Sequence, residues 1–364
     1  MTFPAQARVL MRIGIEVGVP NVMVGSSVNA RILNQEGTPI ADVEAMQPLK
    51  ASLGGEGIQL GSATDDRLYL QPLTPDGLVF IHQNWYRGLV ELIPGQGGLI
   101  AVNQVGIDDY VSSVVGAEMG HRFPSEALKA QAVAARSYAL FHRNLRLQQP
   151  FDLADDQSAQ VYKGVSSESN LTQVASQETS NQVLTFQGQV INAVFHSSSG
   201  GHTEDVANVW TEPLPYLKGV PDFDVEAPVF NWSETIPAQL AQQNIGGVGS
   251  ILNIEVVQRS PYGRAMTVAV TGSGGNKSLS ADQFRKLMGL KSTMFSISPV
   301  GGSSTTASLV PVANAPLSFQ INGRGFGHGI GMSQWGAAGL AQKGWSYEQI
   351  LKHYYQGASL AALQ

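Results

Sequence analysis

The segment from Pro124 to Leu147 constrains the fold more than any other part of the chain. It reads PSEALKAQAVAARSYALFHRNLRL, which is dense in strong helix formers, and its proline stands where the first turn of a helix tolerates one. Its alanines, at positions 127, 130, 132, 134, 135 and 139, lie all round the helix. Small side chains on every face allow close packing on more than one side. The segment therefore predicts a long helix inside the body of the protein.

The residues before this helix predict strands. From about Arg8 to Gln104, short alternating or apolar runs are broken by Gly, Pro and Asn, as in 67–71, 86–92 and 99–102. Together with the helix they indicate the α+β class, with a β-rich body packed on the long alanine-rich helix. At 364 residues, the chain is long enough for a smaller inserted part as well.

The residues after the helix divide into further segments. Residues 182–186 and 189–195 predict a strand pair around Gln187-Gly188, and 222–300 predict an inserted α+β lobe with strands at 251–258 and 265–271 and a helix near 281–288. A strand at 317–321, a short helix near 337–342 and a helix capped by Ser346 follow. The predicted regions are a β-rich region 1–98, a catalytic core 99–221, the lobe 222–300, a flexible linker 301–316, and the C-terminal part of the core 317–364.

Composition excludes several classes of function. The net charge is −6, only 14% of residues are charged and no basic run occurs, so we expect no nucleic-acid partner. There is no cysteine, which excludes disulfides, a thiol nucleophile and thiolate metal sites. No apolar run of about 18 residues occurs, so the chain as given is not expected to span a membrane. Its first residues lack the pattern of a signal peptide, which fits either a cytoplasmic protein or a removed leader.

Glu118 is a candidate general acid. It lies just before the long helix, flanked by Val114, Val115, Ala117 and Met119. Apolar surroundings raise the pKa of a carboxylic acid, as a general acid near neutral pH requires. The alternative is an exposed loop glutamate, the commoner environment for this residue type.

Lys129 and Arg136 lie two turns apart on the same face of the predicted helix. Charged groups on a packed helix need an anionic partner, and Glu118 is the obvious candidate. Two side chains that extend to water are the alternative.

Two polar segments later in the chain hold further candidates. His196 and His202 flank SSSGG, but their spacing matches no zinc motif, and the serines of this stretch lack the GxSxG turn of a hydrolase. The glycine loop GRGFGHGIGMSQWG fails the spacing of nucleotide-binding loops. It allows close approach of another segment or of a ligand, with His328 and Gln334 as polar contacts, although a purely structural crossing fits equally well.

The residues of these motifs and their order along the chain resemble those of the sporulation stage II protein D and amidase-enhancer family. The resemblance rests on VVGAEM followed by PSEALKAQAVAARSYAL, on Tyr86-Arg87-Gly88 and Gln160-Val-Tyr162, and on FHSSSGGHTEDVANVW, PYLKGV and the closing block from GRGFGHGIG to LKHYY. It covers roughly 99–355.

The resemblance implies a secreted cell-wall protein that cleaves peptidoglycan glycan strands between N-acetylmuramic acid and N-acetylglucosamine, preferably after a partner amidase has removed the stem peptides. It implies a lytic transglycosylase with Glu118 as the catalytic acid, supported by Lys129 and Arg136. We expect the substrate-binding residues to be Gln160, Tyr162, His196, Ser198, His328 and Gln334. It also implies a location in the periplasm or cell wall.

Three alternatives remain open. Some relatives hold zinc with cysteines and histidines, but this chain lacks cysteine, so we expect no cofactor and rank a zinc hydrolase last. Asp108, Asp109, Glu204 and Asp205 are candidate second carboxylates if the enzyme is a hydrolase. The main rival is a non-catalytic glycan-binding activator of a cell-wall amidase. Oligomeric state and biological process are not predicted.

Overall fold

The computed structural model describes residues 9–120, 122–156, 159–210, 213–301 and 316–363. The chain divides into two compact units, Met1–Asn192 with Ser359–Gln364, and Ala193–Ala358. Both contain helices and strands, which confirms the predicted α+β class. In the described ranges, no helix is both long and apolar enough to cross a membrane. The predicted linker 301–316 lies almost wholly outside the described residues.

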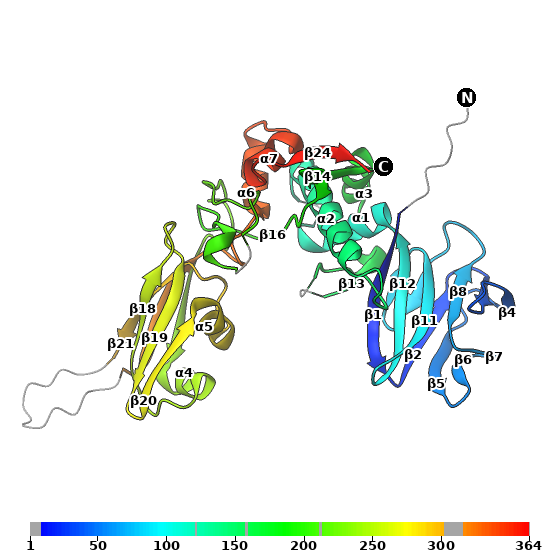
Figure 1. Cartoon of the computed structure of the whole chain (residues 1–364), viewed down its shortest axis with the longest axis horizontal. Helices are drawn as coiled ribbons and strands as arrows, with labels where there is room; N and C mark the ends of the chain where they lie inside the picture. Colours follow the sequence, from blue (N-terminus) through cyan, green and yellow to red (C-terminus); the bar gives the residue numbers. More distant parts are fainter. Residues whose placement is uncertain (1–8, 121, 157–158, 211–212, 302–315, 364) are drawn as a thin grey trace, which may run out of the picture. The chain divides into compact units, whose positions relative to one another are not determined.

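Two antiparallel sheets form the β-rich part of the first unit (Figure 1). The seven-stranded sheet has the order β13 (Leu153–Ala154), β1 (Leu10–Val19), β12 (Gly98–Gly106), β11 (Leu89–Gly95), β8 (Leu68–Pro72), β3 (Ala30–Leu33) and β4 (Pro39–Val43); only β13 runs parallel to its neighbour. The six-stranded sheet has the order β10 (Asn84–Tyr86), β9 (Val79–Ile81), β2 (Asn21–Ser26), β5 (Leu49–Gly54), β6 (Gly57–Leu60) and β7 (Ala63–Asp65). In β8, Leu68 and Leu70 are buried and Tyr69 is not, the alternation that predicted this strand.

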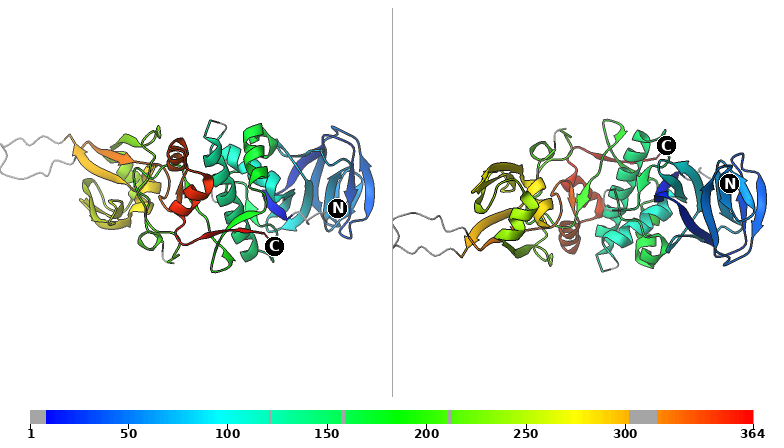
Figure 2. Two further views of the ribbon diagram at one scale, coloured as in Figure 1. Left: turned by 90° about the horizontal axis from the view of Figure 1, so that it is seen from above. Right: turned by 90° about the horizontal axis from the view of Figure 1, so that it is seen from below.

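Three helices pack together in the first unit beside these strands (Figure 2). They are α1 (Ile107–Glu118), α2 (Ser125–Leu145) and α3 (Asn170–Glu178). The six alanines of α2 named above are all fully buried, so the predicted packing on several faces is confirmed. Pro124 precedes the first turn of α2. A short 3-10 helix, η1 (Gly164–Ser167), lies against α1.

The two ends of the first unit's chain meet in a small sheet of the order β15 (Gln189–Val190), β14 (Gln182–Phe186), β24 (Ser359–Ala362). The predicted strand pair is confirmed at β14, but its second strand is shorter than predicted. Gln187 and Gly188 form the two-residue turn between β14 and β15, and both have positive φ, as such a tight turn requires. Nothing in the sequence indicated that β24 pairs with β14.

The second unit contains two three-stranded sheets that share one apolar core. The first has the order β17 (Asn231–Pro237), β22 (Ser318–Arg324), β21 (Phe295–Val300), and the second the order β18 (Ile251–Arg259), β19 (Ala265–Gly272), β20 (Gly275–Ser280). Helices α4 (Ala238–Ile245) and α5 (Ala281–Met288) contribute to the same core. The strands and helix predicted for 251–288 are thus confirmed. β22, which belongs to the same sheet as β17, begins after the predicted linker.

Local sequence explains where the helices of this unit begin. Ser280 caps α5 in a reciprocal arrangement with Gln283, and Gly289 ends the helix in the left-handed conformation. Ser346 caps α7 (Tyr347–Tyr354) in the same way, as predicted. The remaining elements are η2 (Val206–Asn208), α6 (Gln334–Gln342), and a parallel pair formed by β16 (Phe195–His196) and β23 (Met332–Ser333). The finer division into five regions remains a prediction.

Candidate functional site

Glu118 is the last residue of α1 and is half-buried. Val114 and Val115 are fully buried and Met119 nearly so, which confirms the apolar flanks that the sequence predicted. The Oε1 atom of Glu118 accepts a hydrogen bond of 3.1 Å from the backbone N–H of Val161. The carboxyl is therefore held in place by a segment 43 residues further along the chain.

Gln160 connects this segment to the helices. Tyr110, on α1, donates a 3.0 Å hydrogen bond to Oε1 of Gln160, and the amide of Gln160 donates to the carbonyl oxygen of Ala135 on α2. Burial raises the pKa of Tyr110 well above its usual range, and the nearby charge of Glu118 contributes in the same direction. Tyr110 therefore remains a neutral hydrogen-bond donor. The neighbour of Val161 is thus anchored to both helices.

Gln160 and Tyr162, predicted to bind substrate, are buried side chains that are hydrogen-bonded within the protein. The Tyr162 hydroxyl donates a 2.7 Å hydrogen bond to Oδ1 of Asn103. The centroid of its ring lies 5.0 Å from that of Tyr110 and 5.4 Å from that of Tyr86. In this arrangement the two residues position the segment that holds Glu118. Direct contact with a substrate remains a prediction.

Arg136 has other partners than the sequence suggested. Its side chain is fully buried, and its Nε and Nη2 atoms donate to Asp108 at 3.2 and 2.9 Å. The carbonyl oxygens of Ser176 and Gln182 accept further bonds at 3.0 and 3.2 Å, and the Thr179 hydroxyl oxygen accepts one at 3.5 Å. The prediction that Glu118 is the anionic partner of Arg136 is therefore wrong. The reason is that Arg136 faces the start of α1, where Asp108 lies, and Glu118 ends that helix.

Lys129 also pairs with other carboxylates. Its ammonium lies 2.9 Å from Glu126 and 2.7 Å from Glu178, and its side chain is 18% exposed. These hydrogen bonds raise its pKa, that to Glu178 most strongly. The cationic pair predicted from the helix spacing thus links α2 to α1 and α3. Any role of Lys129 and Arg136 in catalysis remains a prediction.

Two groups in the first unit were not recognised from the sequence. Burial raises the pKa of Asp155 to about 6, and its charge, like that of Glu118, raises the pKa of Tyr110. Arg87, from the Tyr86-Arg87-Gly88 motif, forms a two-pronged pair with Glu168, at 2.9 to 3.1 Å. Asp155 could have been noticed in the sequence because a second acidic residue, Asp156, follows it directly. Glu168 carried no signal, because its partner lies 81 residues away in the chain.

In the second unit, Ser198 belongs to a buried polar network. Its hydroxyl donates to Oδ2 of Asp224, which also accepts the backbone N–H of Gly200 at 2.8 Å. Asp222 accepts the hydroxyls of Ser199 and Tyr354, and burial together with the charge of Asp224 raises the pKa of Asp222. Ser198 is fully buried and bound to a carboxylate rather than to a histidine. This geometry does not form the serine–histidine pair of a nucleophilic site.

His196 and His328 lie together, with ring centroids 5.2 Å apart. Nδ1 of His196 contacts the carbonyl oxygen of Ile330 at 3.1 Å, and Nε2 of His328 contacts that of Phe195 at 3.0 Å. Desolvation lowers the pKa of His196 well below its usual range and that of His328 to about 4. Both rings are therefore neutral near pH 7. Trp210, which is 37% exposed, lies 5.6 Å from His328.

The remaining predicted residues have separate positions in this unit. Gln334 is the first residue of α6 and is buried. His202 stacks on Tyr262, with centroids 4.1 Å apart, and its Nδ1 lies 2.7 Å from the carbonyl oxygen of Thr203. Within the described part of the chain, no three His, Asp or Glu side chains gather as metal ligands would. The structure thus brings Glu118 and Gln160 together in the first unit, and His196 and His328 together in the second.

Comparison with known proteins matches both parts of this architecture. Residues 95–186, which include Glu118, α2 and Gln160, match the family described as "Stage II sporulation protein". Residues 216–331, which include most of the second unit's sheets, match a "Domain of unknown function (DUF8618)".

Individual relatives agree with the first match. Stage II sporulation protein D of Bacillus subtilis is 34% identical over 279 residues, which are 72% of this chain and 76% of that protein. An uncharacterised protein of Brachyspira hyodysenteriae is 32% identical over 300 residues, 78% of this chain and 76% of that protein. The amidase enhancer of B. subtilis is 29% identical over 301 residues, 69% of this chain but only 40% of that protein. The family resemblance expected from the motifs is thereby confirmed, and the chain belongs to the stage II sporulation protein D family.

Proposed function

We propose that this chain is a cell-wall protein that cleaves peptidoglycan glycan strands as a lytic transglycosylase, with Glu118 as general acid and base. The position of Glu118 is the observation that carries this proposal. The carboxyl is half-buried between apolar residues, and its Oε1 is held by the Val161 N–H. Acid–base catalysis is favoured when supporting contacts hold the carboxyl within hydrogen-bond reach of the reacting oxygens.

The reaction needs one carboxyl group. In the proposed step, Glu118 donates its proton to the glycosidic oxygen between N-acetylmuramic acid and N-acetylglucosamine as the bond from the muramyl C1 to this oxygen breaks. The C6 hydroxyl of the same muramyl residue then bonds to C1 and gives its proton to the Glu118 carboxylate. The products are a 1,6-anhydromuramyl end and a free sugar hydroxyl, and the enzyme regains its starting protonation.

The structure argues against Asp108 and Asp109 as the second carboxylate of a hydrolase. Asp108 and Asp109 lie ten and nine residues before Glu118 on the same helix. A rise of 1.5 Å per residue places them roughly 14 to 15 Å from Glu118, beyond the ~5 to 9.5 Å between the two carboxylates of glycosidases. Asp108 is also bound to Arg136. Asp155, whose charge raises the pKa of Tyr110 as that of Glu118 does, is the second carboxylate we would test in a hydrolase built from the first unit.

The test is product analysis on purified peptide-free glycan strands. We expect mass spectrometry to detect 1,6-anhydromuramyl ends with the unchanged protein, and a loss of at least about 100-fold with Glu118→Gln, since one acid–base group contributes about 10²- to 10⁴-fold. Glu36→Gln, an exposed carboxylate of the same unit, is the control and should leave the rate unchanged. Undiminished cleavage by Glu118→Gln would refute the assignment. Products without anhydro ends that form only while Asp155 is intact would indicate a hydrolase.

A second function is supported by the relative named amidase enhancer. In that case the chain binds glycan strands without cleaving them and activates a cell-wall amidase. It predicts no anhydro ends from the unchanged protein, but faster release of stem peptides when the protein is added to an amidase. Either function places the protein outside the cytoplasmic membrane, in the periplasm or cell wall, which we propose as its location.

A further inference from the structure

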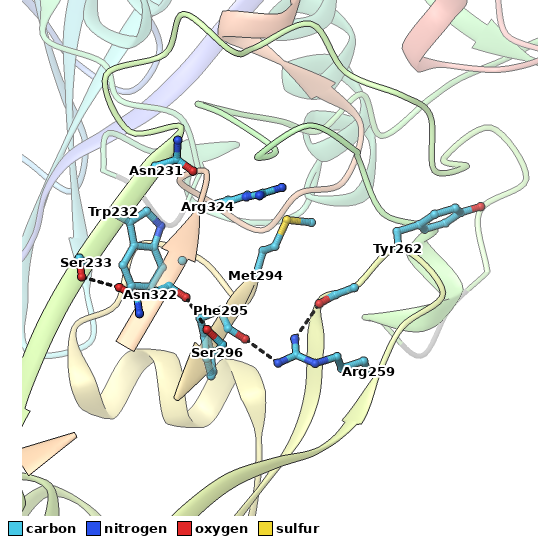
Figure 3. Close-up of a pocket in the computed structure, with 12 residues that line it drawn as sticks. Asn231, Trp232, Ser233, Arg259, Tyr262, Met294, Phe295, Ser296, Asn322 and Arg324 are labelled. Atoms are coloured by element: carbon cyan, nitrogen blue, oxygen red, sulfur yellow. Dashed lines mark hydrogen bonds between the residues drawn. The ribbon is translucent and has the colours of Figure 1, made fainter. Parts of the chain in front are cut away.

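The second unit contains an open groove with a volume of about 790 Å³. Its walls come from β17, β21 and β22, from the end of β18 and from the turn that follows β18 (Figure 3). None of the residues discussed as catalytic lines it. All its lining residues fall between 231 and 324, inside the stretch that matches the domain of unknown function. Its volume is in the usual range of ligand sites, roughly 300 to 1,000 Å³.

Tyr262 gives this groove a fixed flat surface. Trp232 also lines the groove, but it is only 8% exposed and belongs to the apolar core of the unit, and its Nε1 donates a 2.9 Å hydrogen bond to the carbonyl oxygen of Gly325. Tyr262, on the opposite side in Figure 3, is 38% exposed and stacks on His202 with only 14° between the rings. Side chains that are already immobilised lose little entropy when a ligand covers them.

Between these rings the groove presents neutral hydrogen-bonding groups. Asn231 and Asn322 are exposed amides from neighbouring strands, and Ser296 is an exposed hydroxyl. The Ser233 hydroxyl donates a 2.6 Å hydrogen bond to Oδ1 of Asn322, which fixes the orientation of that amide. Amides and hydroxyls in this arrangement suit a ligand with many hydroxyl and acetamido groups.

The two arginines of the groove differ in their partners. Arg259 donates to the carbonyl oxygens of Gly263 and Phe295, at 2.8 and 3.0 Å, so its fork is occupied by the protein. Arg324 is exposed, and among the described residues its guanidinium contacts the ring of Phe230, 6.0 Å from the centroid. Its hydrogen-bond donors face the groove in Figure 3. A planar guanidinium in this position is suited to a carboxylate.

We propose that this groove is a binding site for an acidic amino-sugar polymer, with a sugar face on Tyr262 and a sugar carboxylate on Arg324. The identification of this polymer as a peptidoglycan glycan strand rests on the proposed function, because the lactyl group of each N-acetylmuramic acid bears a carboxylate once the stem peptide is removed. The groove belongs to the second unit and Glu118 to the first, so the groove is a binding site distinct from the catalytic carboxyl. It would also select stripped strands, since an intact stem peptide occupies that carboxylate in an amide bond.

The test measures equilibrium binding of soluble, peptide-free glycan strands to the full chain carrying Glu118→Gln, in which cleavage is suppressed. Arg324→Gln and Tyr262→Ala in this background should each weaken binding at least tenfold. Arg31→Gln, an arginine of similar exposure in the other unit, should leave it unchanged. Strands whose carboxylates have been converted to methylamides should bind the parent protein as weakly as unmodified strands bind Arg324→Gln.

The outcomes separate this site from the proposed reaction. Binding that is equal for the parent, Arg324→Gln and Tyr262→Ala would overturn the proposal, as would equal affinity for the methylamidated strands. Loss of binding in all variants including Arg31→Gln would also count against it, because no specific groove would then be involved. If Glu118→Gln still cleaves strands, the catalytic assignment fails, and the same comparison at short times still decides about the groove. Each variant should retain the parent's circular dichroism spectrum.

Discussion

Replacing Arg136 by methionine tests whether this arginine stabilises the first unit. The change keeps an unbranched side chain but removes the charge that holds Asp108 and the donors for the Ser176 and Gln182 carbonyl oxygens. Breaking a buried ion pair costs about 3 to 5 kcal/mol. The Asp108 side chain is 35% exposed, so water stabilises the remaining charge and the cost falls to the lower end.

The carbonyl groups of Ser176 and Gln182 lose their guanidinium donors, which raises this cost again by roughly 1 kcal/mol or more. We therefore expect a loss of about 4 kcal/mol in the free energy of unfolding of the first unit. For a unit of this size, that corresponds to a decrease of about 8 to 16 °C in the melting temperature. The assay is thermal unfolding followed by circular dichroism at 222 nm, where the helices dominate the signal.

Arg143 provides the control on the same helix. It lies two turns further on, is 33% exposed and is 3.9 Å from Asp152. Its replacement by methionine should cost less than about 1 kcal/mol, because Arg143 is partly exposed and Asp152 keeps its 2.7 Å ion pair with Arg12. Asp108→Asn should also destabilise the unit, and the double variant with Arg136→Met should lose less than the sum of the two single losses. A melting temperature of Arg136→Met within about 2 °C of the parent protein would refute this reasoning.

Two further predictions concern the second unit. The pKa of His328 is lowered to about 4, against about 6.5 in an unfolded chain, so the unfolded state binds the proton more readily between these values. Stability of this unit should therefore fall as the pH decreases from 6.5 to 4, with His196 acting in the same direction, and urea titrations should show a smaller fall for His328→Gln. In Gly329→Ala, a Cβ would lie 2.2 Å from Cζ of the fully buried Arg264, so we expect a loss of about 2 to 4 kcal/mol. Gly344→Ala, also at positive φ but with nothing within 4 Å of the Cβ, should cost only about 1 kcal/mol, and equal losses would contradict the explanation.

The elements that could be predicted from the sequence are those whose causes are local. Helix α2 follows from its run of helix formers behind Pro124, and its buried alanines follow from small residues on every face. The caps at Ser280 and Ser346 and the turn at Gln187-Gly188 follow from nearest neighbours in the chain. The apolar flanks of Glu118 belong to the same class, since α1 itself supplies them. Helix periodicity, capping and turn conformation depend on a few consecutive residues, and all of these can be read in order.

Which charged and polar groups meet could be learned only from the folded chain. The spacing of Lys129 and Arg136 showed that they share a helix face but not that Arg136 would reach Asp108, 28 residues earlier. The hold of Val161 on Glu118 and the pairing of β24 with β14 likewise join residues remote in the chain. The groove that contains Arg324 is built from β17, β18, β21 and β22, and the sequence did not indicate that these strands come together. The physical reason is that partner choice depends on which surfaces the packed core brings together, and hydrogen bonds and ion pairs act only over a few ångströms.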